Sequence, residues 1–235
     1  MPTQEQFQQA LEESSQQFAQ LIAQGNLDAP VASCPGWTMR ELAQHMCGTQ
    51  RWATYALING ERGEFQEAPA QREELLAYFN EGTRELLAAS RTIDPQQPTW
   101  SFGPQPRLSA FWTRRQAHEV TIHLCDAYAS QGQSFEIPEA LAIDGIEELG
   151  EVFFPMLVKT GRFAPLPQAL VLAPKNSSTR VTLTTLVDTS GPQVIVHGEA
   201  ADLLLMLWGR KPLSELEIEG DQALAEEFLA QGVTP

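Results

Sequence analysis

Two side chains in the middle of the chain, Glu119 and His123, have the spacing of metal ligands. They lie four residues apart in a segment whose apolar residues recur with helical spacing, so both leave the same face of the helix. An earlier predicted helix carries His45 on its buried stripe. Two imidazoles and one carboxylate hold a divalent ion while leaving coordination positions open for chemistry. The sequence therefore predicts a metal centre built from these three residues.

A structural interpretation of the same residues stays open. Arg115 lies four residues before Glu119 and could neutralise its carboxylate as a helix ion pair, with no metal bound. A single histidine on an apolar face, such as His45, is more often a hydrogen-bonded core residue than a ligand. Against this, a buried carboxylate is costly unless it is paired or coordinated, and Glu119 shares its predicted face with His123.

The residues on either side of the predicted ligands have other expected roles. The run from His118 to His123 superficially matches the H-E-x-x-H helix of zinc proteases. Its two histidines are five residues apart, which turns them about 140° away from each other on a helix. We therefore do not expect His118 to share the ion. Asp126, three residues after His123, can accept a hydrogen bond from the second ring nitrogen and orient the ring, or it can be a surface carboxylate.

Helical periodicity dominates the first two thirds of the chain. Amphipathic helices are predicted over 3–24, from Thr38 to about Leu57, over 71–91 and over 108–130, and a fifth opens at Pro138. Thr38 followed three residues later by Glu41 is a capping box, which fixes the start of the helix that carries His45. These elements predict a metal-binding helical bundle of four to five helices over residues 1–160.

After about residue 161 the pattern changes to short runs rich in Val, Leu and Thr, separated by Pro, Gly, Asn and Ser. Runs at 169–173, 180–186, 194–197 and 213–219 predict the strands of an antiparallel sheet. Helices are expected at 199–208 and 221–230. The sequence therefore predicts a second domain over 161–235, a small α+β unit behind the helical one.

The charge of the chain bears on its partners. It has 30 acidic and 15 basic residues, with a formal net charge of −15. A field of this sign repels phosphate backbones and anionic lipid, so we expect no nucleic-acid and no membrane partner. No apolar stretch approaches the roughly 20 residues needed to cross a bilayer, and the first residues lack the pattern of a signal peptide. A cytoplasmic protein is expected.

The three cysteines, Cys34, Cys47 and Cys125, are predicted to be reduced. Their number is odd and they contain no C-x-x-C pair. Cys47 lies two residues after His45 and Cys125 two after His123, which is about 200° of helical turn, so each points away from the predicted metal face. We expect these two cysteines to be small buried hydrophobic residues that neither bind metal nor act as nucleophiles.

Three motifs, taken in order, resemble the mycothiol-dependent maleylpyruvate isomerase family over nearly the whole chain. They are CPGWTMRELAQH at 34–45, RQAHEVTIHLCD at 115–126 and GEAADLLLMLWGR at 198–210. The resemblance implies a DinB-like four-helix bundle with zinc, or another divalent metal, bound by His45, Glu119 and His123. It also implies a small C-terminal α+β domain in which Arg210 is a candidate contact for an anion.

The same resemblance implies an enzyme of small-molecule metabolism. A low-molecular-weight thiol, mycothiol or bacillithiol, would be bound and activated by the metal, because the cation stabilises thiolate over thiol. The thiolate would add to the cis double bond of a maleylpyruvate-like dicarboxylate, permit rotation and leave to give the trans product. No catalytic residue of the chain is assigned beyond that metal-bound thiol.

The dicarboxylate would need local positive charge, for which Arg210 and Arg115 are the candidates. Arg210 could instead complement the C-terminus of the preceding predicted helix. Two alternatives to the isomerase stay open, since fold and metal transfer between relatives better than reaction does. One is a thiol S-transferase that acts on other electrophiles. The other is a non-enzymatic, metal-stabilised module that binds a small molecule or a protein.

Overall fold

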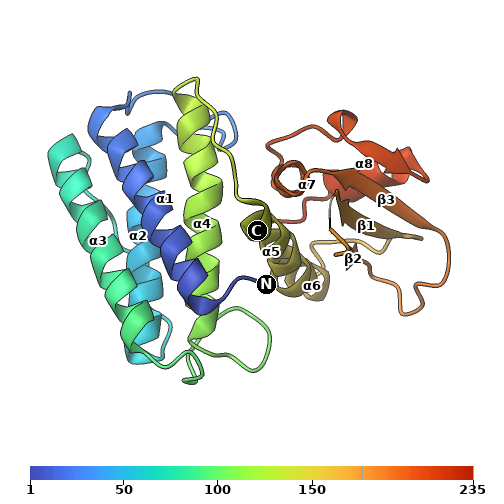
Figure 1. Cartoon of the computed structure of the whole chain (residues 1–235), viewed down its shortest axis with the longest axis horizontal. Coiled ribbons are helices and arrows are strands. Elements are labelled where there is room, and N and C mark those ends of the chain that lie inside the picture. The colour runs from blue at the N-terminus through green and yellow to red at the C-terminus, as the bar shows by residue number, and fades with distance from the viewer. Residues whose placement is uncertain (176, 235) are drawn as a thin grey trace. The chain divides into compact units, whose positions relative to one another are not determined.

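Four long helices make up the first of the two units into which the chain divides. The computed structural model describes residues 1–175 and 177–234, and its first unit spans Pro2–Glu136 (Figure 1). The helices are α1 (Gln4–Gln24), α2 (Met39–Asn59), α3 (Arg72–Thr92) and α4 (Ala110–Ser130). The predicted four-helix bundle is therefore confirmed, with helix ends within a few residues of those expected.

Each helix of the bundle packs mainly on two others: α1 and α2 each lie against α3 and α4. Large apolar side chains fill the space between them, among them the fully buried Phe18, Met46, Phe79 and Trp112. The capping box predicted for α2 is present: the backbone N–H of Thr38 donates to Glu41 Oε2 at 2.7 Å. This fixed start sets which face of α2 carries His45.

The connection between α2 and α3, residues 60–71, returns along α2 (Figure 1). The side chain of Arg40, at the start of α2, donates to the carbonyl of Ala70 at 2.6 Å, and Gln44 donates to the carbonyl of Ala68 at 3.0 Å. These bonds hold the end of the connection beside the first two turns of α2. The two helices therefore run in the same direction, and the connection passes the helix face that carries His45.

The second unit runs from Ile137 onward and contains both helices and a sheet. It opens with α5 (Glu139–Glu148), a π-helical stretch η1 (Leu149–Phe153) and α6 (Phe154–Lys159). Helix α5 packs against the later helix α7 (Ala200–Leu207). The contacts within the chain divide it at Ile137, and the domain boundary expected after residue 160 stays a prediction.

Four strands form the sheet of the second unit, in the order β2-β1-β3-β4. They are β1 (Ala169–Pro174), β2 (Val181–Leu183), β3 (Gln193–Gly198) and β4 (Glu217–Glu219), and α8 (Gln222–Ala230) follows them. All six residues of β1 are buried, as befits a central strand. The small α+β domain predicted from the sequence is therefore confirmed as a class.

The sheet is mixed, where a purely antiparallel one was expected. β1 pairs with β2 antiparallel, but with β3 parallel, placing Leu170 opposite Val194. The residues between β2 and β3 carry the chain back past β1 to its other side, so that β3 starts from the same end as β1. Residues 213–215, expected to be part of a strand, form a 3₁₀ turn ahead of β4. The alternation of apolar and polar residues along one strand does not reveal which strand it pairs with or in which direction.

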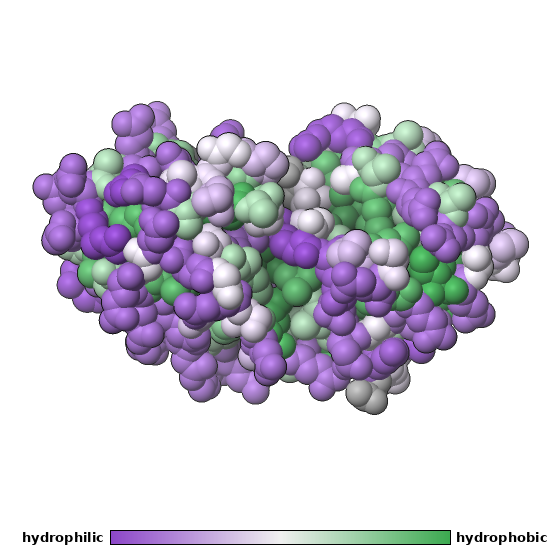
Figure 2. Space-filling model, turned by 90° about the horizontal axis from the view of Figure 1, so that it is seen from above, coloured by the Kyte–Doolittle hydropathy of each residue, from purple (hydrophilic) through white to green (hydrophobic). Residues whose placement is uncertain are grey.

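Hydrophilic residues cover most of the face of the helical unit that is visible in Figure 2. Among the described residues, no helix combines the length and the apolar character that a membrane-spanning segment needs.

Candidate metal centre

The two predicted histidine ligands converge on one carboxylate oxygen of the third ligand, Glu119. Glu119 Oε1 lies 3.1 Å from His45 Nε2 and 3.5 Å from His123 Nε2. The candidate ligand atoms of the three residues all lie within 4.8 Å of one another. His45 comes from α2, whereas Glu119 and His123 leave the same face of α4, against which α2 packs. Helix spacing and helix packing together therefore bring two imidazoles and a carboxylate to one point.

Arg115 holds the other oxygen of the same carboxylate. Its Nη2 donates to Glu119 Oε2 at 2.8 Å, and the arginine is only 2 % exposed. The ion pair considered as an alternative to metal binding is thus present. It engages Oε2, while Oε1 faces the two histidines. Ion pairing and metal coordination of Glu119 are compatible in this geometry, with the carboxylate binding through one oxygen.

Asp126 contacts the second ring nitrogen of His123, in the position expected from the sequence. His123 Nδ1 and Asp126 Oδ2 are 2.9 Å apart, and Asp126 is buried. The hydroxyl of Ser33 donates to Asp126 Oδ1 at 2.6 Å. With Nδ1 engaged by the carboxylate, Nε2 is the nitrogen that faces Glu119. A chain of two hydrogen bonds therefore fixes the orientation of this imidazole.

The buried charges at the site perturb its titration. Burial alone would raise the pKa of Glu119, but hydrogen bonds with the two histidines and the charge of Arg115 hold that pKa well below its ordinary value. Burial alone would lower the pKa of His123, but hydrogen bonds with Asp126, Cys34 and Glu119 raise it well above its ordinary value. Both directions favour the charged form of each group, the ionised carboxylate of Glu119 and the protonated imidazole of His123. A divalent cation could take the place of that proton, which fits the donor set.

A second group, which the sequence did not lead us to expect, shares His123 with the first. Cys34 Sγ lies 3.9 Å from Asp126 Oδ2, and Cys34, His123 and Asp126 also have candidate ligand atoms within 4.8 Å of one another. Cys34 and Ser33 belong to the turn that directly precedes the cap of α2. That closeness to the start of the helix bearing His45 was the signal that could have placed them at the site.

Two aromatic rings flank His45. The ring of Trp37 lies 5.0 Å from the imidazole between centroids, and the ring of Phe65 is stacked at 6.0 Å with an interplanar angle of 28°. Neither ring was predicted to lie here, because both come from connections between helices. They give the side of the site around His45 an apolar, aromatic border.

The other residues considered from the sequence lie outside the candidate groups. Cys47 is buried, and burial raises the pKa of its thiol to about 12, so it stays protonated at neutral pH. His118 is buried as well, with its ring edge-on to Phe7 at 5.8 Å. Among the described residues, neither group of potential metal ligands includes it.

Arg210 lies in the second unit, where its Nη1 donates to the carbonyl of Trp208 at 2.5 Å. Its contact with a substrate stays a prediction.

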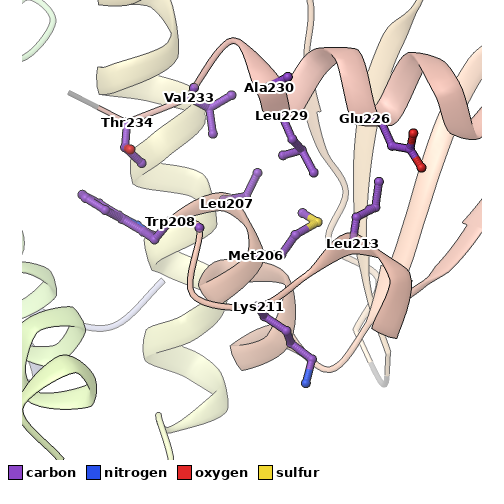
Figure 3. A pocket seen from close by; sticks show the side chains of 12 residues that line it. Met206, Leu207, Trp208, Lys211, Leu213, Glu226, Leu229, Ala230, Val233 and Thr234 are labelled. Carbon is purple, nitrogen blue, oxygen red and sulfur yellow. The ribbon is translucent and has the colours of Figure 1, made fainter. Parts of the chain in front are cut away.

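The second unit also contains a pocket whose lining is mainly apolar (Figure 3). Met206, Leu207 and Leu229 are among its lining side chains. Lys211, at its edge, is ion-paired with Asp202 at 3.2 Å and with Glu215 at 3.0 Å. Because its cation is already paired with two carboxylates, this pocket offers a small anion little unbalanced charge.

Comparison with known protein families gives matches over both units. Residues 8–128 match the family described as the mycothiol maleylpyruvate isomerase N-terminal domain, and residues 140–227 match the C-terminal domain of the same isomerase. No curated protein matches the chain.

Two solved structures are similar in fold. One is the crystal structure of a histidine-to-alanine mutant of the mycothiol-dependent maleylpyruvate isomerase, with 17 % sequence identity, a TM-score of 0.60 and 93 % of each chain covered. The other is a crystal structure of the mycothiol-dependent maleylpyruvate isomerase, with 18 % identity, a TM-score of 0.58 and coverage of 89 % of this chain and 90 % of that one. At these identities the likeness concerns the fold.

Proposed function

The chain belongs to the mycothiol maleylpyruvate isomerase family, and on this basis we propose that it is a metal-dependent enzyme that uses a low-molecular-weight thiol to isomerise a maleylpyruvate-like dicarboxylate. The observation that carries the proposal is the convergence of His45 Nε2 and His123 Nε2 on Glu119 Oε1. Family membership alone would not require these three residues to meet. Two imidazoles and one carboxylate are a ligand set suited to zinc with a position left for a thiol.

His45, Glu119 and His123 would hold the divalent ion. When bound, that ion would supply a Lewis acid that favours the thiolate form of an incoming mycothiol or bacillithiol. Arg115 keeps Glu119 Oε2 occupied at 2.8 Å and so directs Oε1 toward the histidines. Asp126 orients His123 through its Nδ1. These contacts supply a site whose ligands are already arranged before a thiol arrives.

The proposed reaction needs no nucleophile from the chain. The thiolate forms a carbon–sulfur bond to one carbon of the cis double bond, and the electron pair moves toward the neighbouring carbonyl. Rotation about the new single bond follows. Loss of the thiolate then restores the double bond in the trans form, so that the thiol is regenerated and no atom is gained or lost. Cys47 would take no part, because the pKa of its thiol is raised to about 12 by burial.

We therefore expect isomerisation of a maleylpyruvate-like substrate to require added mycothiol or bacillithiol. We also expect it to survive replacement of Cys34, Cys47 and Cys125 by serine, since the nucleophile is the added thiol. The measurement is the rate of conversion with and without thiol, followed by separation of the cis and trans products, on metal-loaded protein. The triple variant should keep both its metal and its thiol dependence.

The product distinguishes the remaining possibilities. Accumulation of a stable thioether in place of the trans isomer would indicate an S-transferase. Loss of turnover in a folded, metal-loaded triple variant would make one of the cysteines the nucleophile, with Cys34 the first to test because it lies beside Asp126. If no electrophile reacts with any added thiol while the metal is bound, the enzymatic proposal is wrong.

A further inference from the structure

A pocket lies beside the metal centre within the helical unit. It is lined by Trp52, Arg62, Gly63, Glu64 and Phe65 and has a volume of about 530 Å³. This is within the range of ordinary small-molecule sites. Trp52 comes from α2, and the other four residues come from the connection that returns along that helix. The indole Nε1 of Trp52 donates to the carbonyl of Gly63 at 3.1 Å, which ties the connection to the helix.

Phe65 connects this pocket to the metal centre. The residue lines the pocket, and its ring is stacked on the imidazole of His45 at 6.0 Å. The ring fits there because position 48 of α2 is a glycine: a Cβ at Gly48 would lie 2.1 Å from Phe65 Cζ. A glycine inside a helix lowers the free energy of unfolding by about 0.5 to 1 kcal/mol relative to alanine. The helix therefore loses some stability at the position that admits the ring of Phe65. The pocket and the candidate ligand His45 thus share one aromatic side chain.

Arg62 gives the pocket a cation with an unusual environment. Arg51 and Arg91 of the same unit are paired with the carboxylates of Glu81 and Glu12. Within the described part of the chain, the guanidinium of Arg62 has neither an ion pair nor a hydrogen bond, and it lies over the ring of Trp100 at 5.7 Å. In a protein with twice as many acids as bases, 30 against 15, a guanidinium left without a carboxylate is available to an anion from outside.

We propose that this pocket binds one carboxylate end of an unsaturated dicarboxylic acid, with Arg62 contacting the carboxylate and the rings of Trp52 and Phe65 packing against the planar carbon skeleton. Arginine matches a carboxylate through two parallel N–H donors, which makes it specific for this group. Glu64, on the same connection, disfavours a second carboxylate in the pocket and directs that end elsewhere. The proposal rests on the proposed function for its substrate class and adds the residue that recognises it.

Binding of maleate, measured by calorimetry on the metal-loaded full chain without any thiol, tests this assignment. Arg62→Ala should weaken maleate binding by about 10- to 100-fold, the loss expected for a charge-assisted hydrogen bond. Arg62→Lys should recover part of the loss, since it keeps the charge without the fork of donors. Neutral dimethyl maleate should bind equally to all variants. The matched control is Arg84→Ala, which removes the same charge from the exposed surface of α3 and should leave maleate binding unchanged.

Equal maleate affinities for the wild-type and Arg62→Ala proteins would overturn the proposal. So would an equal loss in Arg84→Ala, which would indicate a general effect of net charge, or the absence of measurable binding to the wild-type protein. Because neither a thiol nor turnover enters the measurement, Arg62-dependent binding can hold even if the protein proves to have no isomerase activity. Failure of the catalytic proposal is thereby distinguished from failure of this one. Equal metal contents of all variants should accompany the result.

Discussion

Replacement of His45 or His123 by alanine is expected to remove the bound metal. A zinc site of four ligands binds its ion with a free energy of about 10 to 16 kcal/mol. Each protein ligand therefore contributes on the order of 3 kcal/mol, or about 100-fold in affinity for the metal. The proposed site has three protein ligands, and Glu119 Oε1 lies within 3.5 Å of both imidazoles. Loss of either imidazole would leave a two-ligand site that releases its ion on dialysis.

Elemental analysis of the purified, dialysed variants measures this directly. The wild-type protein should carry about one divalent ion per chain. His197→Ala is the matched control, because His197 lies in β3 of the second unit, 3.5 Å from Glu219, outside either candidate group. It should keep its ion. Full occupancy in both His45→Ala and His123→Ala would show that the ligands have been assigned to the wrong residues.

Arg115→Ala is expected to destabilise the metal-free protein by about 3 kcal/mol, the cost of removing one partner of a buried ion pair. Arg115 is 2 % exposed and donates to Glu119 Oε2 at 2.8 Å. Without the guanidinium, the ionised carboxylate of Glu119 keeps only its histidine partners. A bound divalent ion would compensate that charge from the other side. The loss should therefore be smaller in the metal-loaded protein.

Urea unfolding at neutral pH, once with a chelator and once with zinc, gives the two free energies of unfolding. Arg84→Ala serves as the control, because Arg84 is an exposed residue 3.8 Å from Glu81 in a surface pair, worth less than about 1 kcal/mol. An equally large loss for Arg115→Ala with and without zinc would mean that Arg115 stabilises the bundle by contacts unrelated to the metal ligand.

The parts of the site that lie on helices could be predicted from the sequence. The spacing of Glu119 and His123 is a property of any helix, and the capping box at Thr38 set the face of α2 on which His45 lies. Asp126 followed from the same geometry, one turn beyond His123. These predictions required only that the segments be helical and that α2 and α4 pack together.

The residues in connections could not be predicted in the same way. Phe65 reaches His45 because the connection 60–71 returns along α2, and a loop has no periodicity from which such a path can be inferred. Its 12 residues can span roughly 40 Å when extended, enough for the return but equally compatible with other routes. The parallel pairing of β1 with β3 escaped prediction for a related reason, because it depends on where a connection crosses the sheet.

The central claim is that the ion held by His45, Glu119 and His123 binds a low-molecular-weight thiol. Calorimetric titration of mycothiol or bacillithiol into zinc-loaded protein, chelator-treated protein and the His45→Ala variant tests it most directly. Saturable binding of about one thiol per chain to the zinc-loaded protein alone is the predicted result. Equally tight binding of the thiol to the metal-free protein, or to His45→Ala, would contradict the account.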